Sequence, residues 1–150
     1  MDVDKKKFYD VAMRMQANSS ILFSNDCNNS NHGSVYLAGY VLEAYIKVLL
    51  LNYGETRFYG HVGETKFLNK FKRITSVHPE IADILHESNP LYPEALLVGQ
   101  DGADDKSSWD VNHRYSVNIW GDMDFCQRVQ KEILQLKTAL IELRIQGVLS

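Results

Sequence analysis

The residues best suited to recognise a nucleotide gather in one short segment of the sequence. Trp109, His113, Arg114 and Tyr115 follow one another closely, and Trp120 stands a little further on. A guanidinium and an imidazole can form charge-assisted hydrogen bonds with a phosphate, and aromatic faces can stack on a base. In the alternative, which we place slightly ahead, Trp109 and Tyr115 plug the end of a helical bundle. Arg114 then pairs with Glu43 or with one of the acidic residues Asp101, Asp104, Asp105 and Asp110.

A basic stripe is the second group that could contact a ligand. On a helix, Lys66, Lys70 and Arg73 share one side of the stretch from Glu64 to Ile74, and apolar residues share another. Such a stripe is more often the solvated face of a surface helix than a phosphate contact, and we favour the first reading. The net charge of −3 gives the chain no overall basic character, so nucleic acid would have to bind a local patch of this kind.

A fold must position these side chains, and the stretch from Ser34 to Gly54 is its predicted centre. The polar or amphipathic residues Tyr36, Tyr40, Glu43 and Lys47 share one narrow stripe of a helix, and nearly all other positions are apolar. Insertion of this stretch into a membrane would place the charges of Glu43 and Lys47 near the bilayer centre, each at a free-energy cost of about 2.5–3.5 kcal/mol. We therefore expect the core helix of a soluble bundle, with no membrane, capped by the serine and ended by the glycine.

The pair formed by Glu43 and Lys47 has two alternative roles. Exposed on the helix surface, this acid and base one turn apart would stabilise the helix only slightly. Buried beside Tyr36 and Tyr40, they would organise a polar network inside the bundle or at a dimer interface. Tyr40, Glu43 and Lys47 therefore join the candidate ligand-binding residues.

Apolar residues recur at helical spacing on both sides of this centre. They predict an amphipathic helix from Asp4 to Phe23, the helix from Glu64 to Ile74, a short helix starting at Pro79 and a last helix from Asp122 to Gly147. A polar loop from Asn25 to Gly33 precedes the central helix. The expected fold is an all-α, antiparallel bundle of four to five helices.

The segment from Tyr92 to Gly121 shows no helical period. A structureless connection of that length is unusual in a compact domain and indicates either a function or hidden extended structure. Apolar and polar residues alternate from Val111 to Ile119 as in a strand. A short hairpin with residues Ala95 to Val98, or an extended excursion before the last helix, is therefore a further expectation.

Several residues stand in an order found in a known helical family. They are Tyr36-Leu37-Ala38-Gly39-Tyr40, Glu43, Lys47, Leu49 and Leu50 in the central helix, then His61 and Leu68, and finally the Arg114-Tyr115 pair. Together with the polar, glycine-containing loop before the central helix, this order resembles the HEPN domain superfamily over roughly Phe8 to Leu143. The resemblance implies a HEPN-like helical bundle and a homodimer.

The resemblance also suggests which residues could be catalytic. HEPN ribonucleases cut RNA without a metal, using an arginine and, about four to six residues later, a histidine that acts as general acid or base. The family's arginine would be Arg114, but those spacings lead to Ile119, Trp120 and Gly121, which cannot transfer a proton. The resemblance therefore implies an inactive member, or else a non-standard use of His113 or His61.

Arg73 and His78 match the family's spacing once, earlier in the chain than the family places the motif. Pro79 biases the preceding histidine out of the helical region, whereas the arginine lies on a predicted helix. Their relative placement is therefore uncertain from sequence, and we rank this pair as the weaker catalytic candidate.

The 150 residues are the size of one domain, and we expect a single domain over residues 1–150. The N-terminus has no apolar signal-peptide core, so we expect a cytoplasmic protein. Cys27 and Cys126 are expected to be reduced, and no spacing of ligands suggests a metal or another cofactor.

Together with the resemblance, these observations favour a dimeric, catalytically inactive module that mediates an interaction or binds a nucleotide or RNA. The resemblance implies a protein partner such as a nucleotidyltransferase, in a toxin–antitoxin or antiviral-defence system. The alternative is a metal-independent ribonuclease toxin, and a third possibility is a purely structural subunit. Cleavage of total RNA by the pure protein would separate the enzyme from the binding module.

Overall fold

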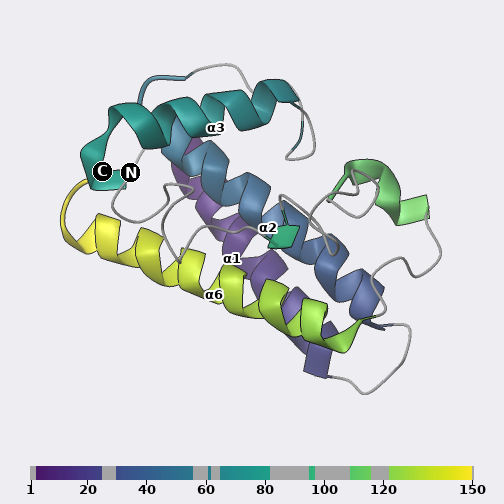
Figure 1. Cartoon of the computed structure of the whole chain (residues 1–150). Coiled ribbons are helices and arrows are strands. Elements are labelled where there is room, and N and C mark those ends of the chain that lie inside the picture. Colours follow the sequence, from purple (N-terminus) through teal and green to yellow (C-terminus); the bar gives the residue numbers. More distant parts are fainter. Residues whose placement is uncertain are drawn as a thin grey trace.

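The computed structural model describes residues 3–24, 30–55, 61, 65–81, 95–96, 109–115 and 122–149. The helices in these ranges are α1 (Val3–Ser24), α2 (Ser30–Asn52), α3 (Thr65–Val77), the 3-10 helix η1 (Val111–Tyr115) and α6 (Met123–Ile145). Figure 1 shows α1, α2 and α6 side by side, with η1 beside the start of α2. The described residues contain no strand, so the expected all-α bundle is confirmed.

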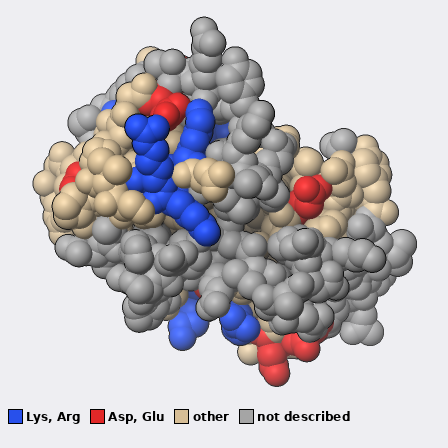
Figure 2. All heavy atoms as spheres, turned by 45° about the horizontal axis from the view of Figure 1, so that its top comes forward, with Lys and Arg blue, Asp and Glu red and all other residues tan. Residues whose placement is uncertain are grey.

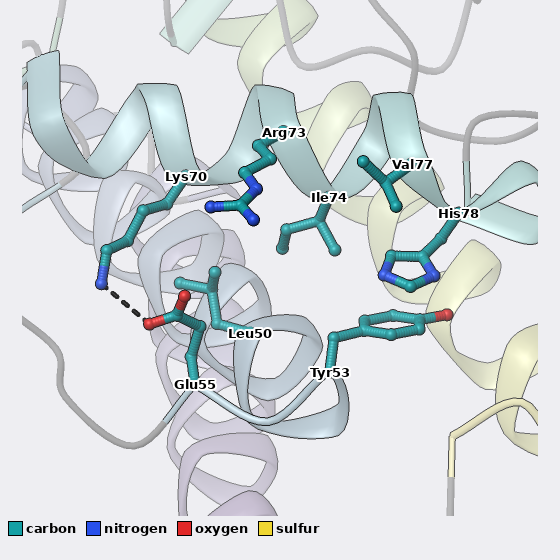
Figure 3. Close-up of a pocket in the computed structure, with 8 residues that line it drawn as sticks. All are labelled: Leu50, Tyr53, Glu55, Lys70, Arg73, Ile74, Val77 and His78. Carbon is teal, nitrogen blue, oxygen red and sulfur yellow. Dashed lines mark hydrogen bonds and ion pairs between the residues drawn. The ribbon is translucent and has the colours of Figure 1, made fainter.

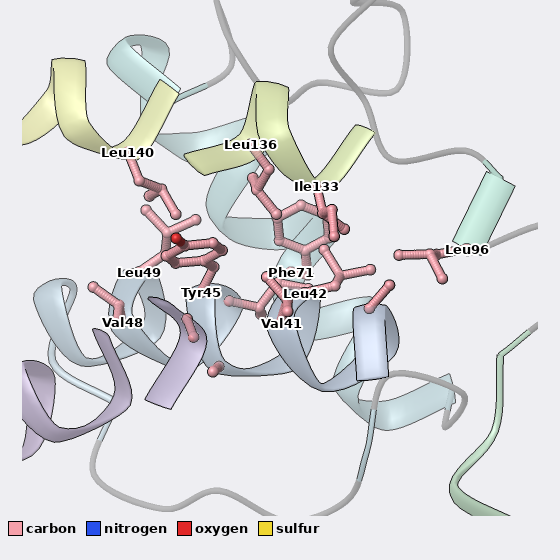
Figure 4. Close-up of a cluster of buried hydrophobic side chains, with 14 of the residues drawn as sticks. Val41, Leu42, Tyr45, Val48, Leu49, Phe71, Leu96, Ile133, Leu136 and Leu140 are labelled. Atoms are coloured by element: carbon pink, nitrogen blue, oxygen red, sulfur yellow. The ribbon is translucent and has the colours of Figure 1, made fainter. Parts of the chain in front are cut away.

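Helix α2 is the centre of the structure, as its sequence predicts. It contacts α1, α3, α6 and η1, and its contacts with α1 are the most extensive. Figure 4 shows its buried side chains in one cluster with Phe71 of α3 and with Ile133, Leu136 and Leu140 of α6. Each such aliphatic side chain stabilises the fold by about 1.5–3 kcal/mol when fully buried. The α2 residues with no exposed surface include Val41, Leu42, Ile46, Val48 and Leu49.

Polar bonds between the three long helices fix their direction. At one end, Ser19 of α1 donates to the carbonyl oxygen of Ser34 in α2 (2.7 Å) and accepts from the Gln130 amide of α6 (2.8 Å). At the other end, Asn52 of α2 accepts from Lys5 of α1 (3.3 Å) and donates to the carbonyl of Val148 after α6 (2.9 Å). Helix α1 is therefore antiparallel to both α2 and α6, which run in the same direction.

The start of α2 differs from the sequence prediction. Ser34 is not the N-cap, because the helix begins at Ser30 and Ser34 is fully buried inside it. The early residues of α2 pack on α1, where a side-chain carbon placed on Gly33 would touch Leu22 at 3.4 Å. This packing stabilises a turn of helix that the composition alone favours as a loop. Within the predicted loop, residues 25–29 lie outside the described part.

The expected hairpin is wrong where the structure describes it. Residues Val111–Tyr115 form the 3-10 helix η1, and Ala95 and Leu96 are helical. A local turn replaces the strand because the Asp110 carboxylate accepts from the Asn112 amide (2.7 Å) and its carbonyl accepts from the His113 amide (3.1 Å). These bonds satisfy the backbone without a partner strand. Residues 97–98 and 116–119 lie outside the described ranges.

The predicted helix ends at Gly54, Asp122 and Gly147 are confirmed, whereas α1 begins at Val3, so Asp4 lies inside it. Gly54 and Gly147 adopt positive φ values of 86° and 77° after α2 and α6. Asp122 caps α6, its carboxylate accepting from the Phe125 amide at 2.9 Å. The helix expected from Pro79 is present at residues 79–81, and its continuation lies outside the described residues.

The buried Cys126 is a free thiol whose pKa is raised by burial to about 11.

One described helix segment, His32–Asn52, is long and apolar enough to cross a membrane. However, 72% of its most apolar window is buried inside the bundle. The core helix of a soluble protein meets the same criterion of length and composition, so this is only weak evidence for a membrane span.

Candidate functional site

Trp109 covers the part of the polar stripe of α2 that Tyr36 and Tyr40 form. Trp109 is 1% exposed, and its indole Nε1–H donates to the Tyr36 carbonyl oxygen at 3.0 Å. The backbone amide of Trp109 donates to the Leu96 carbonyl at 3.1 Å. Its ring centroid lies 6.0 Å from that of Tyr36 and 5.2 Å from that of Tyr40. Trp109 and Tyr40 therefore pack against each other, and the indole has almost no surface left for a ligand.

Gly39 makes room for this tryptophan. A side-chain carbon at this position would lie 2.0 Å from two ring atoms of Trp109, closer than real contacts allow. The glycine in the middle of α2 thus permits the close approach of the indole, at a cost in helix propensity of about 1 kcal/mol.

Histidines and tyrosines attach η1 to α2. The hydroxyl of Tyr36 donates to the Val111 carbonyl at 3.2 Å, so its single hydrogen is used and the Tyr40 hydroxyl donates to it at 2.8 Å. The Nε2 of His32 donates to the His113 carbonyl at 2.9 Å. These bonds join two segments that are far apart in the sequence.

His113 is held as a neutral acceptor. Its Nδ1 accepts from the Asp110 amide at 3.1 Å, which leaves no room for a proton on that nitrogen. Burial lowers the pKa of His113, nearby His32 lowers it further, and Asp110 partly offsets both effects.

Tyr115, at the end of η1, is 75% exposed, so the expectation that it plugs the bundle is wrong. The Arg114 side chain lies outside the described part.

Glu43 and Lys47, the remaining candidate residues of α2, bond to each other. Glu43 is 5% exposed and lies 2.6 Å from the Lys47 ammonium and 2.9 Å from the Nδ1 of His61. Lys47 also lies over the ring of Phe8, 5.4 Å from its centroid. The pair thus forms a polar network within the chain, which is one of the roles considered from sequence.

A pocket of about 190 Å³ opens where the end of α2 meets α3 (Figure 3). Two of its residues are basic, Lys70 and Arg73, and Glu55 accepts from the lysine at 2.9 Å. The Arg73 side chain is exposed and forms no ion pair or hydrogen bond with the residues that the structure describes. The complete lining is Leu50, Tyr53, Glu55, Lys70, Arg73, Ile74, Val77 and His78.

Helix geometry brings the two basic residues and His78 to this pocket. Lys70, Arg73 and Val77 are three and four residues apart, so they share one face of α3. The amide of His78 donates to the Ile74 carbonyl at 3.1 Å, which continues the last turn despite Pro79. Arg73 and His78, whose relative placement was uncertain from sequence, therefore line the same pocket.

Aromatic rings form one wall of the pocket. The rings of Tyr53 and His78 stack with centroids 3.6 Å apart and planes inclined by 23°. The Tyr53 hydroxyl donates to the Glu80 carboxylate at 2.7 Å. Burial, and next this bond, raise the pKa of Tyr53 above its ordinary value, and the same bond lowers the pKa of Glu80. Tyr53 therefore stays protonated and oriented.

The pocket lies on a basic surface. Figure 2 shows lysine and arginine side chains gathered on the face that carries α3, where Lys70, Lys72 and Arg73 are described. The side chain of Lys66 lies outside the described part. Sequence reasoning found the stripe but missed Tyr53 and Glu55, because only the turn at Gly54 brings them against α3.

Comparisons with known proteins give no independent assignment. No protein-family model matches the chain, and neither the curated proteins nor the solved structures include a significant match. Among the described residues, no group of three or more His, Cys, Asp and Glu side chains could hold a metal ion. The functional argument therefore rests on the geometry of the described side chains.

The Gly39→Ala variant should lose stability because its methyl group collides with Trp109. We expect the free energy of unfolding to fall by about 1–3 kcal/mol in urea titrations, in the range for overpacked cores. Gly33→Ala is the matched control, since its methyl group meets Leu22 at an ordinary contact distance. The control should be neutral or slightly stabilising, and equal losses in both variants would contradict the packing described for Trp109.

Acid should loosen the attachment of η1. Because the folded-state pKa of His113 lies below that of an unfolded histidine, the unfolded chain binds more protons as the pH falls below about 6.5. Stability is therefore present above that pH and is lost as the pH falls through the folded-state pKa. His113→Asn keeps an acceptor without titrating, so its unfolding free energy should fall less between pH 7 and pH 5. Parallel curves for the two proteins would refute this role.

Proposed function

We propose that this chain is a HEPN-like helical module that binds RNA or a nucleotide in the α2–α3 pocket without cleaving it. The observation that carries the proposal is the exposed Arg73 guanidinium, which points into the pocket without a partner among the described residues. In this proposal the module acts as a homodimer, together with a protein partner such as a nucleotidyltransferase in a toxin–antitoxin or antiviral-defence system.

The charges of the pocket favour a phosphate. Lys70, Arg73 and Glu55 together carry one net positive charge at neutral pH. The pair between Lys70 and Glu55 is about one-third exposed on each side, at 35% and 38%, so solvent screens it and it contributes only about 0–1 kcal/mol. A phosphate bound by Arg73 could therefore draw the lysine away from its present partner.

The size and wall of the pocket suit part of one nucleotide, with the phosphate inside. Its volume of about 190 Å³ is below the range of about 300–1,000 Å³ that is typical of pockets for larger ligands. The stacked rings of Tyr53 and His78 offer an aromatic edge on which a base could pack. A nucleotide within a single strand could place its phosphate at Arg73 and leave neighbouring units in solvent.

The histidines named from the resemblance are already engaged in bonds within the fold. His113 uses its Nδ1 as an acceptor for the turn before η1, and His61 is bonded to the buried Glu43. Both lie outside the lining of the basic pocket. These placements support a module that binds its ligand and leaves it intact.

A ribonuclease remains the second candidate function, favoured by one observation. Arg73 and His78, which have the family's spacing, line the same pocket. His78 stacks on Tyr53, and its Nδ1 lies 3.9 Å from the Glu80 carboxylate. In this alternative the imidazole would transfer the proton and the guanidinium would stabilise the charged phosphate.

Binding of a fluorescein-labelled single-stranded RNA, followed by anisotropy, tests the proposal. Arg73→Ala should weaken binding several-fold and lower the slope of log affinity against log salt by about 0.7, because one phosphate contact is lost. The matched control is Arg128→Ala, which removes an exposed arginine of α6 away from the pocket. Equal effects of the two variants would contradict the proposed site.

The same RNA, recovered after incubation with EDTA, separates binding from cleavage. We expect it to stay intact with the wild-type protein. Cleavage that is abolished by Arg73→Ala, His78→Ala or Arg114→Ala would replace the binding module with the ribonuclease.

A further inference from the structure

We infer that Glu55 selects the ligand of the α2–α3 pocket, favouring a nucleotide with a ribose 2′-hydroxyl over its deoxy counterpart. The inference rests on the proposed function and adds a specificity-determining residue to it. It starts from an acidic side chain placed inside an otherwise basic pocket.

The backbone at the end of α2 aims Glu55 at the pocket. Gly54 adopts a φ of 86°, and the Glu55 amide donates to the Leu50 carbonyl at 3.0 Å, which closes the helix end. Figure 3 shows the carboxylate pointing into the space between α2 and α3, on the side where the Arg73 guanidinium also points. The acid and the two basic residues therefore face one ligand volume.

One oxygen of this carboxylate is available to a ligand. Oε2 accepts from Lys70 at 2.9 Å, whereas Oε1 has no hydrogen-bond or ion-pair partner among the described residues. The side chain is 38% exposed, so a ligand can reach it. Glu80, the carboxylate beside the aromatic wall, already accepts from the Tyr53 hydroxyl. Glu55 thus offers an open acceptor to a ligand in the pocket.

An ionised carboxylate constrains what can bind beside it. It accepts hydrogen bonds and donates none, and it repels a phosphate that approaches without a compensating donor. A ribonucleotide supplies such a donor, because its 2′-hydroxyl lies close to the phosphate group. A deoxyribonucleotide would leave the Glu55 oxygen facing only the anion, so the carboxylate would disfavour it.

Anisotropy with matched oligonucleotides tests the inference. The probes are a labelled single-stranded RNA, a DNA of the same sequence with deoxyuridine for uridine, and a 2′-O-methyl RNA that lacks the donor. The wild-type protein should bind RNA about tenfold more tightly than the other two, equivalent to about 1.4 kcal/mol. Glu55→Ala should bring the three affinities within about twofold, and Glu55→Gln, which keeps an acceptor oxygen, should retain part of the preference.

Equal binding of RNA and DNA by the wild-type protein would overturn the inference, as would an RNA preference that survives in Glu55→Ala. The Arg73→Ala variant separates this failure from failure of the proposed function. If it weakens both RNA and DNA binding, the pocket is the site and only the role of Glu55 is wrong. If it changes neither, the site itself is wrong.

Discussion

The burial of α2 on all sides is the constraint on which the rest of the structure depends. An apolar helix with polar residues along one stripe needs a cover for every face, and that cover comes from α1, α3, α6 and the segment around η1. Trp109 covers Tyr36 and Tyr40 and fits only because residue 39 is glycine. Glu43 can then be buried because Lys47 and His61 both bond to it. A buried carboxylate without such partners would be strongly destabilising.

This arrangement separates two kinds of polar residue. Those in the middle of α2 have partners within the chain and stabilise the packing of its neighbours. Those just after α2, Tyr53 and Glu55, emerge at the surface beside the basic face of α3. The positive φ of Gly54 controls this change from buried helix to exposed pocket wall. The middle of α2 therefore serves packing, and the pocket of the proposed function begins where this helix ends.

Local patterns predicted much of the fold but little of the candidate site. The apolar run identified the central helix, and Gly54, Asp122 and Gly147 marked helix ends, because these features act over a few residues. The start of α2 depends on its packing against α1, and the sequence does not reveal such contacts. The form of η1 depends on local bonds to Asp110, which the alternating pattern after that residue does not show. Likewise, the nearness of Tyr53 to His78 depends on how α3 packs on α2. The sequence shows the stripe of basic residues on α3, but it does not show that the carboxylate of Glu55 lies opposite this stripe.

The most direct test of the central claim is an NMR titration of the isotope-labelled protein with adenosine 5′-monophosphate. A ligand in the pocket should shift the amide resonances of Tyr53, Glu55 and Arg73 together, in proportion to occupancy. Resonances of η1 and of the exposed face of α6 should stay unchanged. Shifts centred on Trp109 and His113 instead, with the resonances of the α2–α3 pocket unmoved, would contradict the account.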